Sequence, residues 1–232
     1  MVSTSTPPSQ GECVCVFDLD GTLADTAPDL IAALNHVLRS NGLRPAGFEE
    51  ARGFVGHGAR VLIERAYRAQ KVPLDEEQAV QRVGQFIAFY RQNIANDTRL
   101  FPNVLRALDT MRSDGWRFAI CTNKPEALAV QLVTELGVLE RFAAITGGDS
   151  FPFRKPDGRH ILETIAKAGG DPSRAIMVGD SAPDIGAARD ANVPVVGVSF
   201  GYFTGTSDEL GADRLIDDFA QLPDAVAALM GV

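Results

Sequence analysis

Two aspartates, Asp18 and Asp20, directly follow an apolar run at residues 14–17. Residues two apart in an extended chain point to the same side, so both carboxyl groups can address one reacting centre. One carboxylate can act as a covalent nucleophile, while the other protonates a leaving oxygen and later deprotonates water. The same two aspartates would also be explained by an aspartate-rich turn or a helix cap without any catalytic role. The pair therefore indicates covalent and acid–base catalysis only if further groups join it.

Three more polar clusters recur along the chain, at Thr122-Asn123, Lys155 and Asp180 with Asp184. A hydroxyl, an amide and backbone N–H groups before a helix form an anion-binding corner, and a lysine supplies the positive charge that a phosphoryl group needs. Carboxylates at i and i+4 suit magnesium, which prefers hard oxygen ligands. Each cluster alone is equally explained by a helix cap or a solvated charge. Together, in this order, they predict a phosphoryl-transfer site.

The clusters follow apolar, strand-like runs, and the segments between the runs have helical spacing. The runs are residues 14–17, 116–121, 142–146, 175–178, 193–198 and, more weakly, 214–216. Strands that alternate with helices in this way predict an α/β fold with a doubly wound, Rossmann-like parallel sheet. Ligands collect at the carboxyl ends of such strands. We therefore expect the four clusters to meet at one edge of the sheet.

Residues 28–94 break this alternation, because they show helical patterns and no convincing strand. The segment is too long for a plain crossover between two parallel strands. We therefore predict a helical cap at 28–94, inserted into a core formed by residues 12–27 and 95–232. Residues 1–11 are expected to be a disordered tail.

The 22 lysines and arginines against 30 acidic residues give a net charge of -8. With no basic run or basic helix face, this balance excludes a nucleic-acid or acidic-membrane partner. No signal peptide is recognisable, and no apolar run is long enough to span a bilayer, so a cytoplasmic enzyme is expected. Cys13, Cys15 and Cys121 lie in apolar runs and are expected to be buried free thiols. A monomer and a homodimer both stay open.

The sequence resembles the haloacid-dehalogenase superfamily, and within it the phosphoglycolate-phosphatase-like members that carry a helical cap after the first strand. The resemblance runs from about Cys13 to the C-terminus. The matching stretches are residues 17–23 with Asp25-Thr26, residues 122–125, residues 147–150, Lys155-Pro156, and residues 178–181 with Asp184-Ile185.

The resemblance implies Mg²⁺-dependent hydrolysis of a small phosphorylated metabolite through a phosphoaspartate. It implies that Asp18 is the nucleophile and a magnesium ligand, and that Asp20 is the general acid and base, its backbone carbonyl also touching the metal. Asp180 would be the remaining protein ligand of magnesium. Asp184 would not bind the metal itself but would hold the metal-binding residues in position. The implied phosphate-binding residues are Thr122, Asn123 and Lys155.

Two positions depart from the family pattern. The family usually has proline where this chain has Gly158, and often has Pro-Gly where this chain has Pro102-Asn103. Neither change removes a reacting group. The departures therefore weaken the assignment to a subfamily but not the expected chemistry.

The cap contains a glycine-rich loop, Gly56-His57-Gly58, which resembles a loop that reads the non-phosphate end of the substrate in phosphoglycolate-phosphatase-like members. It is not a dinucleotide fingerprint, because it follows no strand. Arg52 and Arg60 lie nearby, and Arg60 could pair with a substrate carboxylate, although a solvated helix face explains both arginines as well. The resulting expectation is 2-phosphoglycolate as substrate, bound by the three loop residues and Arg60.

Other functions stay open at this point. A related phosphatase for pyrophosphate, a sugar phosphate or a nucleotide has the same motifs. A dehalogenase on the same scaffold is disfavoured, because such enzymes lack the second acidic group that Asp20 provides here. A non-enzymatic, receiver-like phosphoacceptor module would not need the inserted helices or the second aspartate.

Overall fold

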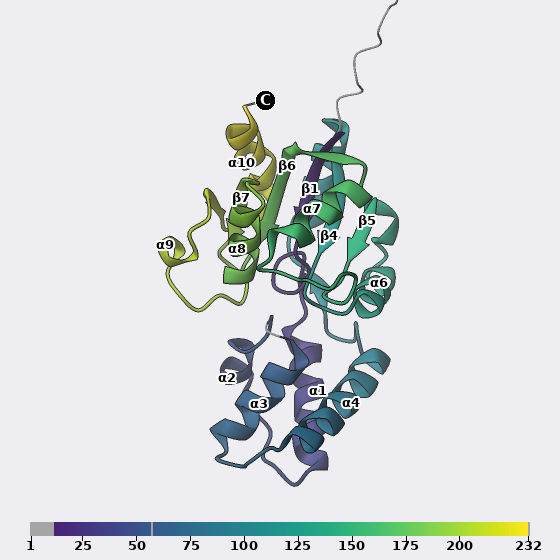
Figure 1. Cartoon of the computed structure of the whole chain (residues 1–232), viewed down its shortest axis with the longest axis vertical. Helices are drawn as coiled ribbons and strands as arrows, with labels where there is room; N and C mark the ends of the chain where they lie inside the picture. The colour runs from purple at the N-terminus through teal and green to yellow at the C-terminus, as the bar shows by residue number, and fades with distance from the viewer. Residues whose placement is uncertain (1–11, 57, 232) are drawn as a thin grey trace, which may run out of the picture.

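The computed structural model describes residues 12–56 and 58–231. Its central sheet has six parallel strands in the order β5-β4-β1-β6-β7-β8 (Figure 1). The strands are β1 (Glu12–Phe17), β4 (Arg117–Cys121), β5 (Ala144–Thr146), β6 (Gly170–Gly179), β7 (Val195–Val198) and β8 (Arg214–Ile216). The predicted doubly wound α/β fold is thus confirmed.

Helices cover both faces of the sheet, as the alternation of side chains along β1 requires. Cys15 and Phe17 point into one apolar layer, and Val14 and Val16 point into the other. The first layer is covered by α5 (Val104–Ser113), α6 (Glu126–Glu135) and α10 (Leu222–Met230). The second is covered by α7 (Gly158–Lys167) and α8 (Ala182–Asp190). Because both faces are buried, the central strands are apolar throughout.

Four helices between β1 and β4 pack together beyond the carboxyl ends of the strands, in the lower half of Figure 1. They are α1 (Ala27–Ser40), α2 (Phe48–Arg52), α3 (Ala59–Ala69) and α4 (Glu76–Gln92). Helix α1 contacts α2 and α4, and α3 contacts α4. We call this group the cap; the exact domain boundaries stay a prediction.

The two chain segments that connect the core to the cap pair with each other. They form β2 (Ala24–Asp25) and β3 (Arg99–Leu100), an antiparallel pair separate from the main sheet. Two-residue strands are too short to leave a periodic pattern, so the sequence did not predict them. The pairing holds the entry and the exit of the cap side by side.

Short segments complete the fold: α9 (Ser207–Leu210) and the 3₁₀ turns η1 (Leu139–Arg141) and η2 (Phe219–Gln221). None of the helices in the described ranges is long and apolar enough to cross a membrane. The three cysteines are free, and Cys15 and Cys121 are buried, as predicted, while Cys13 is partly exposed.

Both departures from the family pattern have a structural explanation. Asn103 precedes α5 in the left-handed region, with φ of 62°, a conformation that asparagine adopts more readily than most non-glycine residues. Gly158 packs its backbone against the end of α8, where an added Cβ would lie 2.5 Å from the Ala191 nitrogen. Its N–H donates to Asp190 Oδ2 at 2.7 Å, a bond that proline could not make.

Candidate active site

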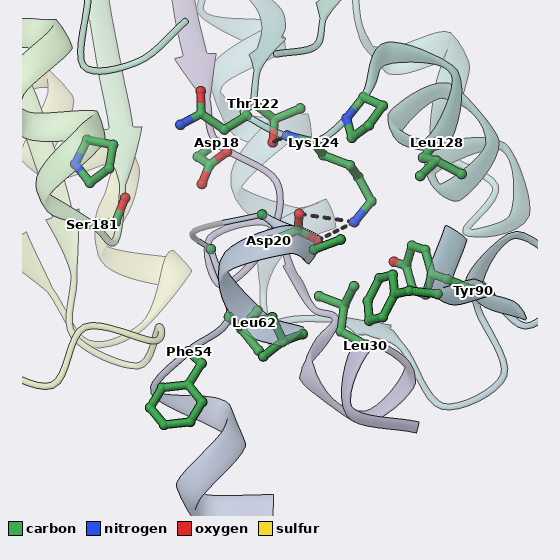
Figure 2. Close-up of a pocket in the computed structure, with 18 of the residues that line it drawn as sticks. Asp18, Asp20, Leu30, Phe54, Leu62, Tyr90, Thr122, Lys124, Leu128 and Ser181 are labelled. Carbon is green, nitrogen blue, oxygen red and sulfur yellow. Dashed lines mark hydrogen bonds and ion pairs between the residues drawn. The ribbon is translucent and has the colours of Figure 1, made fainter. Parts of the chain in front are cut away.

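The carboxyl ends of three strands bring the polar clusters to one cavity between core and cap. Asp18 follows β1, Thr122 follows β4, and Ser181 follows Asp180 at the end of β6. Asp180 itself lines an adjoining cavity that shares Asp18 and Ser181 with this one. Lys155 reaches the same cavity from the segment before α7. Figure 2 shows the core residues of this cavity facing cap side chains such as Leu30 and Leu62. The four clusters therefore meet, as the sheet topology predicted.

Lys155 lies at the centre of the core side. Its Nζ is 2.9 Å from Asp18 Oδ1 and 2.6 Å from Asp184 Oδ1, and the residue is 3% exposed. Burial alone would lower the pKa of Lys155, but attraction by Asp18 and Asp184 outweighs it and raises the pKa above its usual value. The side chain is thus a permanent cation next to Asp18.

Three buried carboxylates lie close together, and Lys155 bonds to two of them. Ligand atoms of Asp18, Asp180 and Asp184 all lie within 4.8 Å of one another. Burial and mutual repulsion raise the pKa of Asp18 to about 6 and that of Asp180 to about 8. Asp18 Oδ1 also lacks an aligned hydrogen-bond donor among the described residues. This excess of buried negative charge fits a metal cation held by oxygen ligands.

Hydrogen bonds hold Asp180 toward the cluster. Thr22 Oγ1 donates to Asp180 Oδ1 at 2.9 Å, and the Tyr202 N–H donates to Asp180 Oδ2 at 2.7 Å. The backbone of Gly21 and Gly201 approaches so closely that an added Cβ would lie 2.6 Å from Asp180 Oδ2 at the first and 2.5 Å from it at the second. The packed backbone leaves Asp180 little freedom to turn away.

Asp184 differs from the other two carboxylates because its own partners occupy both oxygens. Oδ1 accepts from Lys155 Nζ, and Oδ2 accepts from the N–H and the hydroxyl of Ser181. The side chain therefore links Lys155 to the N-terminus of α8. This arrangement suits a supporting role better than direct metal binding.

Asp20 is held by Lys124, a residue of the matching stretch at 122–125 to which the sequence had assigned no role. Lys124 Nζ lies 2.8 Å from Asp20 Oδ1 and 3.0 Å from Oδ2 (Figure 2). Burial disfavours the ammonium, but Asp20 and Tyr90 outweigh that effect, and the pKa of Lys124 is raised. Only its position directly after Asn123, at a strand end, could have drawn attention to it.

Thr122 and Asn123 face the cavity from the end of β4. The Thr122 hydroxyl is buried and accepts the Lys124 N–H at 3.2 Å. Asn123 Nδ2 donates to the Lys155 carbonyl at 3.0 Å, which ties the two loops together. Asn123 Oδ1 is buried and has no partner among the described residues.

The glycine motif at residues 147–150 supports the site from outside the cavity. An added Cβ on Gly147 would lie 2.1 Å from the Glu126 nitrogen, and one on Gly148 would lie 2.5 Å from the Asn123 carbonyl oxygen. Asp149 Oδ1 accepts the Glu126 N–H at 2.7 Å. The motif thus fixes the loop that carries Asn123 rather than contacting a ligand.

The four cap residues expected to bind substrate differ in where the structure places them. Gly56 and Gly58 line the cavity, with φ of 91° and 90°. His57 lies outside the described residues. Arg60 is not where the sequence analysis expected it: its guanidinium bonds to Glu64 and Glu76 on the outer surface of the cap. These two carboxylates satisfy its charge and hold it away from the cavity.

Arg52 has a structural position that the sequence did not reveal. Its Nη2 donates to the carbonyls of Phe200 and Gly201, both at 3.2 Å, and its guanidinium lies 5.7 Å from the centroid of the Tyr202 ring. Arg52 thus joins α2 of the cap to the loop after β7.

Comparisons with known proteins identify the family to which a site of this kind belongs. A model of the haloacid dehalogenase-like hydrolase family matches residues 15–198. A phosphoglycolate phosphatase of Agrobacterium fabrum is 49% identical over 213 residues, 92% of this chain and 91% of the relative. One of Caulobacter vibrioides is 45% identical over 214 residues, 92% of this chain and 90% of the relative.

Solved structures have the same architecture. The crystal structure of a predicted phosphoglycolate phosphatase from Haemophilus somnus 129PT superposes with a TM-score of 0.86 at 32% identity, over 92% of this chain and 97% of that one. CbbY from Rhodobacter sphaeroides, in complex with phosphate, gives 0.77 at 25% identity, over 91% and 96%. The chain belongs to the haloacid dehalogenase-like hydrolase family.

Proposed function

We propose that this chain is a phosphatase that hydrolyses 2-phosphoglycolate to glycolate and phosphate, using Mg²⁺ and a phosphoaspartate at Asp18. The observation that carries the proposal is the convergence of Asp18, Asp20 and Lys155 on one cavity closed by an apolar cap. The names of the relatives that are 49% and 45% identical support the choice of substrate.

In the first step, an Asp18 oxygen forms a bond to phosphorus while the bond from phosphorus to the glycolate oxygen breaks. Asp20 gives its proton to that leaving oxygen. Lys155, Thr122 and Asn123 bind the phosphoryl oxygens and hold them in line for the attack. The products of this step are glycolate and phosphorylated Asp18.

In the second step, Asp20 takes a proton from water, and the water oxygen bonds to phosphorus as the bond to Asp18 breaks. Phosphate leaves, and both aspartates return to their starting states. Asp18, Asp180 and the Asp20 carbonyl would hold Mg²⁺, which when bound neutralises negative charge on the phosphoryl group and the carboxylates. The cap excludes bulk water from the phosphorylated enzyme.

Phosphate release across a panel of esters tests the proposal. We expect the highest kcat/KM for phosphoglycolate among phosphoglycolate, pyrophosphate, a hexose phosphate and a nucleoside monophosphate. Activity should vanish on exhaustive chelation and return with Mg²⁺. A higher kcat/KM for another member of the panel would reassign the substrate, and a single turnover without further phosphate release would indicate a phosphoacceptor module.

A further inference from the structure

We propose that Lys124 and Tyr90 together form the subsite that receives the carboxylate of the substrate. The inference rests on the proposed function and deepens it, because Arg60, the group expected to play this part, is bound to Glu64 and Glu76 outside the cavity.

Few residues of the cavity carry a positive charge that could bind the substrate carboxylate. Among the described residues that line the cavity, the cationic side chains are Lys124 and Lys155. Lys155 is committed to Asp18 and Asp184, at the end where phosphate binds. A second anionic group therefore finds its nearest available cation at Lys124, whose residue is only 8% exposed.

The cap wall offers one further polar side chain. The described cap residues that line the cavity are aliphatic, aromatic or glycine, and only Tyr90 carries a polar side-chain atom. Its hydroxyl is buried and has no hydrogen-bond partner among the described residues. Burial outweighs the opposing influence of nearby Lys124 and raises the pKa of Tyr90 to about 12, so the hydroxyl stays protonated and able to donate. A buried donor without a partner is costly in free energy, which a bound acceptor would relieve.

The two groups lie side by side. Lys124 Nζ is 4.7 Å from the centroid of the Tyr90 ring, and Figure 2 shows the tyrosine hydroxyl on the side of the ring that faces Lys124. Lysine has three N–H donors, and Asp20 occupies two of them. A carboxylate between Lys124 and Tyr90 could accept one hydrogen bond from each.

The position also matches the length of the substrate. In the proposed reaction Asp20 protonates the leaving oxygen, and only one methylene separates that oxygen from the carboxylate of phosphoglycolate. Lys124 contacts the Asp20 carboxyl group at 2.8 Å and 3.0 Å. A group one carbon beyond the leaving oxygen therefore lies within reach of the same ammonium. Without such a partner, an ionised carboxylate against the apolar cap wall would be strongly disfavoured.

Tyr90→Phe removes the hydroxyl and retains the ring. The test compares phosphoglycolate with ethyl phosphate, which has the same chain length and no carboxylate. We expect KM for phosphoglycolate to rise about 10- to 100-fold, as for loss of a hydrogen bond to a charged group, with kcat little changed. The kinetic constants for ethyl phosphate should stay near those of the unmodified enzyme.

Tyr67→Phe is the matched control, because Tyr67 lies in the same cap and its hydroxyl accepts from Arg82 rather than facing the cavity. It should leave both substrates unaffected. An equal change on both substrates in Tyr90→Phe, or no change on phosphoglycolate, would overturn the subsite. If the unmodified enzyme itself shows no preference for phosphoglycolate over ethyl phosphate, the proposed function fails instead.

Lys124→Met gives a second test that does not depend on Tyr90. Both substrates should lose kcat/KM, because Asp20 loses its partner, but phosphoglycolate should lose about tenfold more. Equal losses on the two substrates would mean that Lys124 only positions Asp20. Competitive inhibition by glycolate, measured with ethyl phosphate as substrate, should weaken in both variants, and an unchanged inhibition constant would contradict the proposal.

Discussion

At the scale of single residues, the raised pKa values of Asp18 and Asp180 make the stability of the metal-free protein depend on pH. Both are shifted upward from the usual value of 3.8, to about 6 and about 8. Between about pH 4 and pH 8 these two groups bind more protons in the folded state than in the unfolded state, so their contribution to stability is fully present below about pH 4 and is lost as the pH rises toward 8.

Mg²⁺ should oppose this loss, because the proposed site would bind it through the ionised carboxylates. Thermal unfolding with and without Mg²⁺ should show a gain in Tm that grows from pH 5 to pH 8, reaching about 5–10 °C when the ion is a hundredfold above its Kd. Asp180→Asn should abolish most of this gain. A gain in Tm that is independent of pH would contradict the assignment of these carboxylates as the metal site.

Asp18→Asn should reduce turnover about 10⁴-fold, as expected for loss of a group that acts as part of a catalytic unit. The substitution removes a buried carboxylate that is repelled by its neighbours, so the Tm of the metal-free protein should not fall. Acid-quenched enzyme should carry the mass of one phosphoryl group in the unmodified protein and not in the variant. Substantial turnover in a variant shown by mass to be undeamidated would rule out the phosphoaspartate.

At the scale of elements, the loop after β7 joins Asp180 to the start of the cap. The Tyr202 N–H holds Asp180, while the Tyr202 hydroxyl accepts from the N–H groups of Thr26 at 2.6 Å and Ala27 at 2.8 Å and donates to Asp25 Oδ1 at 2.8 Å. One residue thus supports both Asp180 and the N-terminus of α1.

Tyr202→Phe should leave two buried N–H groups of this turn without partners. We expect the free energy of unfolding to fall by about 1–3 kcal/mol for each unsatisfied group, measured by urea denaturation. Affinity for Mg²⁺ should change little, because the backbone N–H that holds Asp180 is retained. Unchanged stability would show that water or a rearranged turn replaces the hydroxyl.

At the scale of the whole molecule, we propose that the cap moves against the core about the paired segments β2 and β3. The carboxylate of Asp29 at the start of α1 accepts from the N–H groups of Asp97 and Thr98 and from the Thr98 hydroxyl. The two connections are therefore bonded to each other within the β2–β3 pair and again on its cap side, which favours movement of the cap as one body.

Arg52→Ala should shift the cap toward an open position, because Arg52 donates to core carbonyls from α2. Loss of these bonds should lower kcat/KM about 5- to 30-fold for phosphoglycolate and ethyl phosphate alike, unlike Tyr90→Phe. Small-angle scattering should show a larger radius of gyration for the ligand-free variant. The exposed Arg68 on α3 provides the control, since Arg68→Ala should alter neither measurement.

The amino-acid sequence by itself determined the sheet, the inserted helices and the meeting of Asp18, Thr122, Lys155 and Asp180. These features depend on local periodicity and on the rule that parallel strands end at the same edge, so they can be read without knowing how distant segments pack. The tertiary structure alone decided which distant carboxylates the long charged side chains meet. Lys124 and Asp20 are 104 residues apart, and Arg60 and Glu76 belong to different helices. A flexible lysine or arginine can reach several neighbours, and only the packing angle between two elements determines which carboxylate it meets. For that reason the sequence placed Arg60 in the cavity and gave Lys124 no role, whereas in the structure Lys124 lines the cavity and Arg60 pairs with Glu64 and Glu76 outside it.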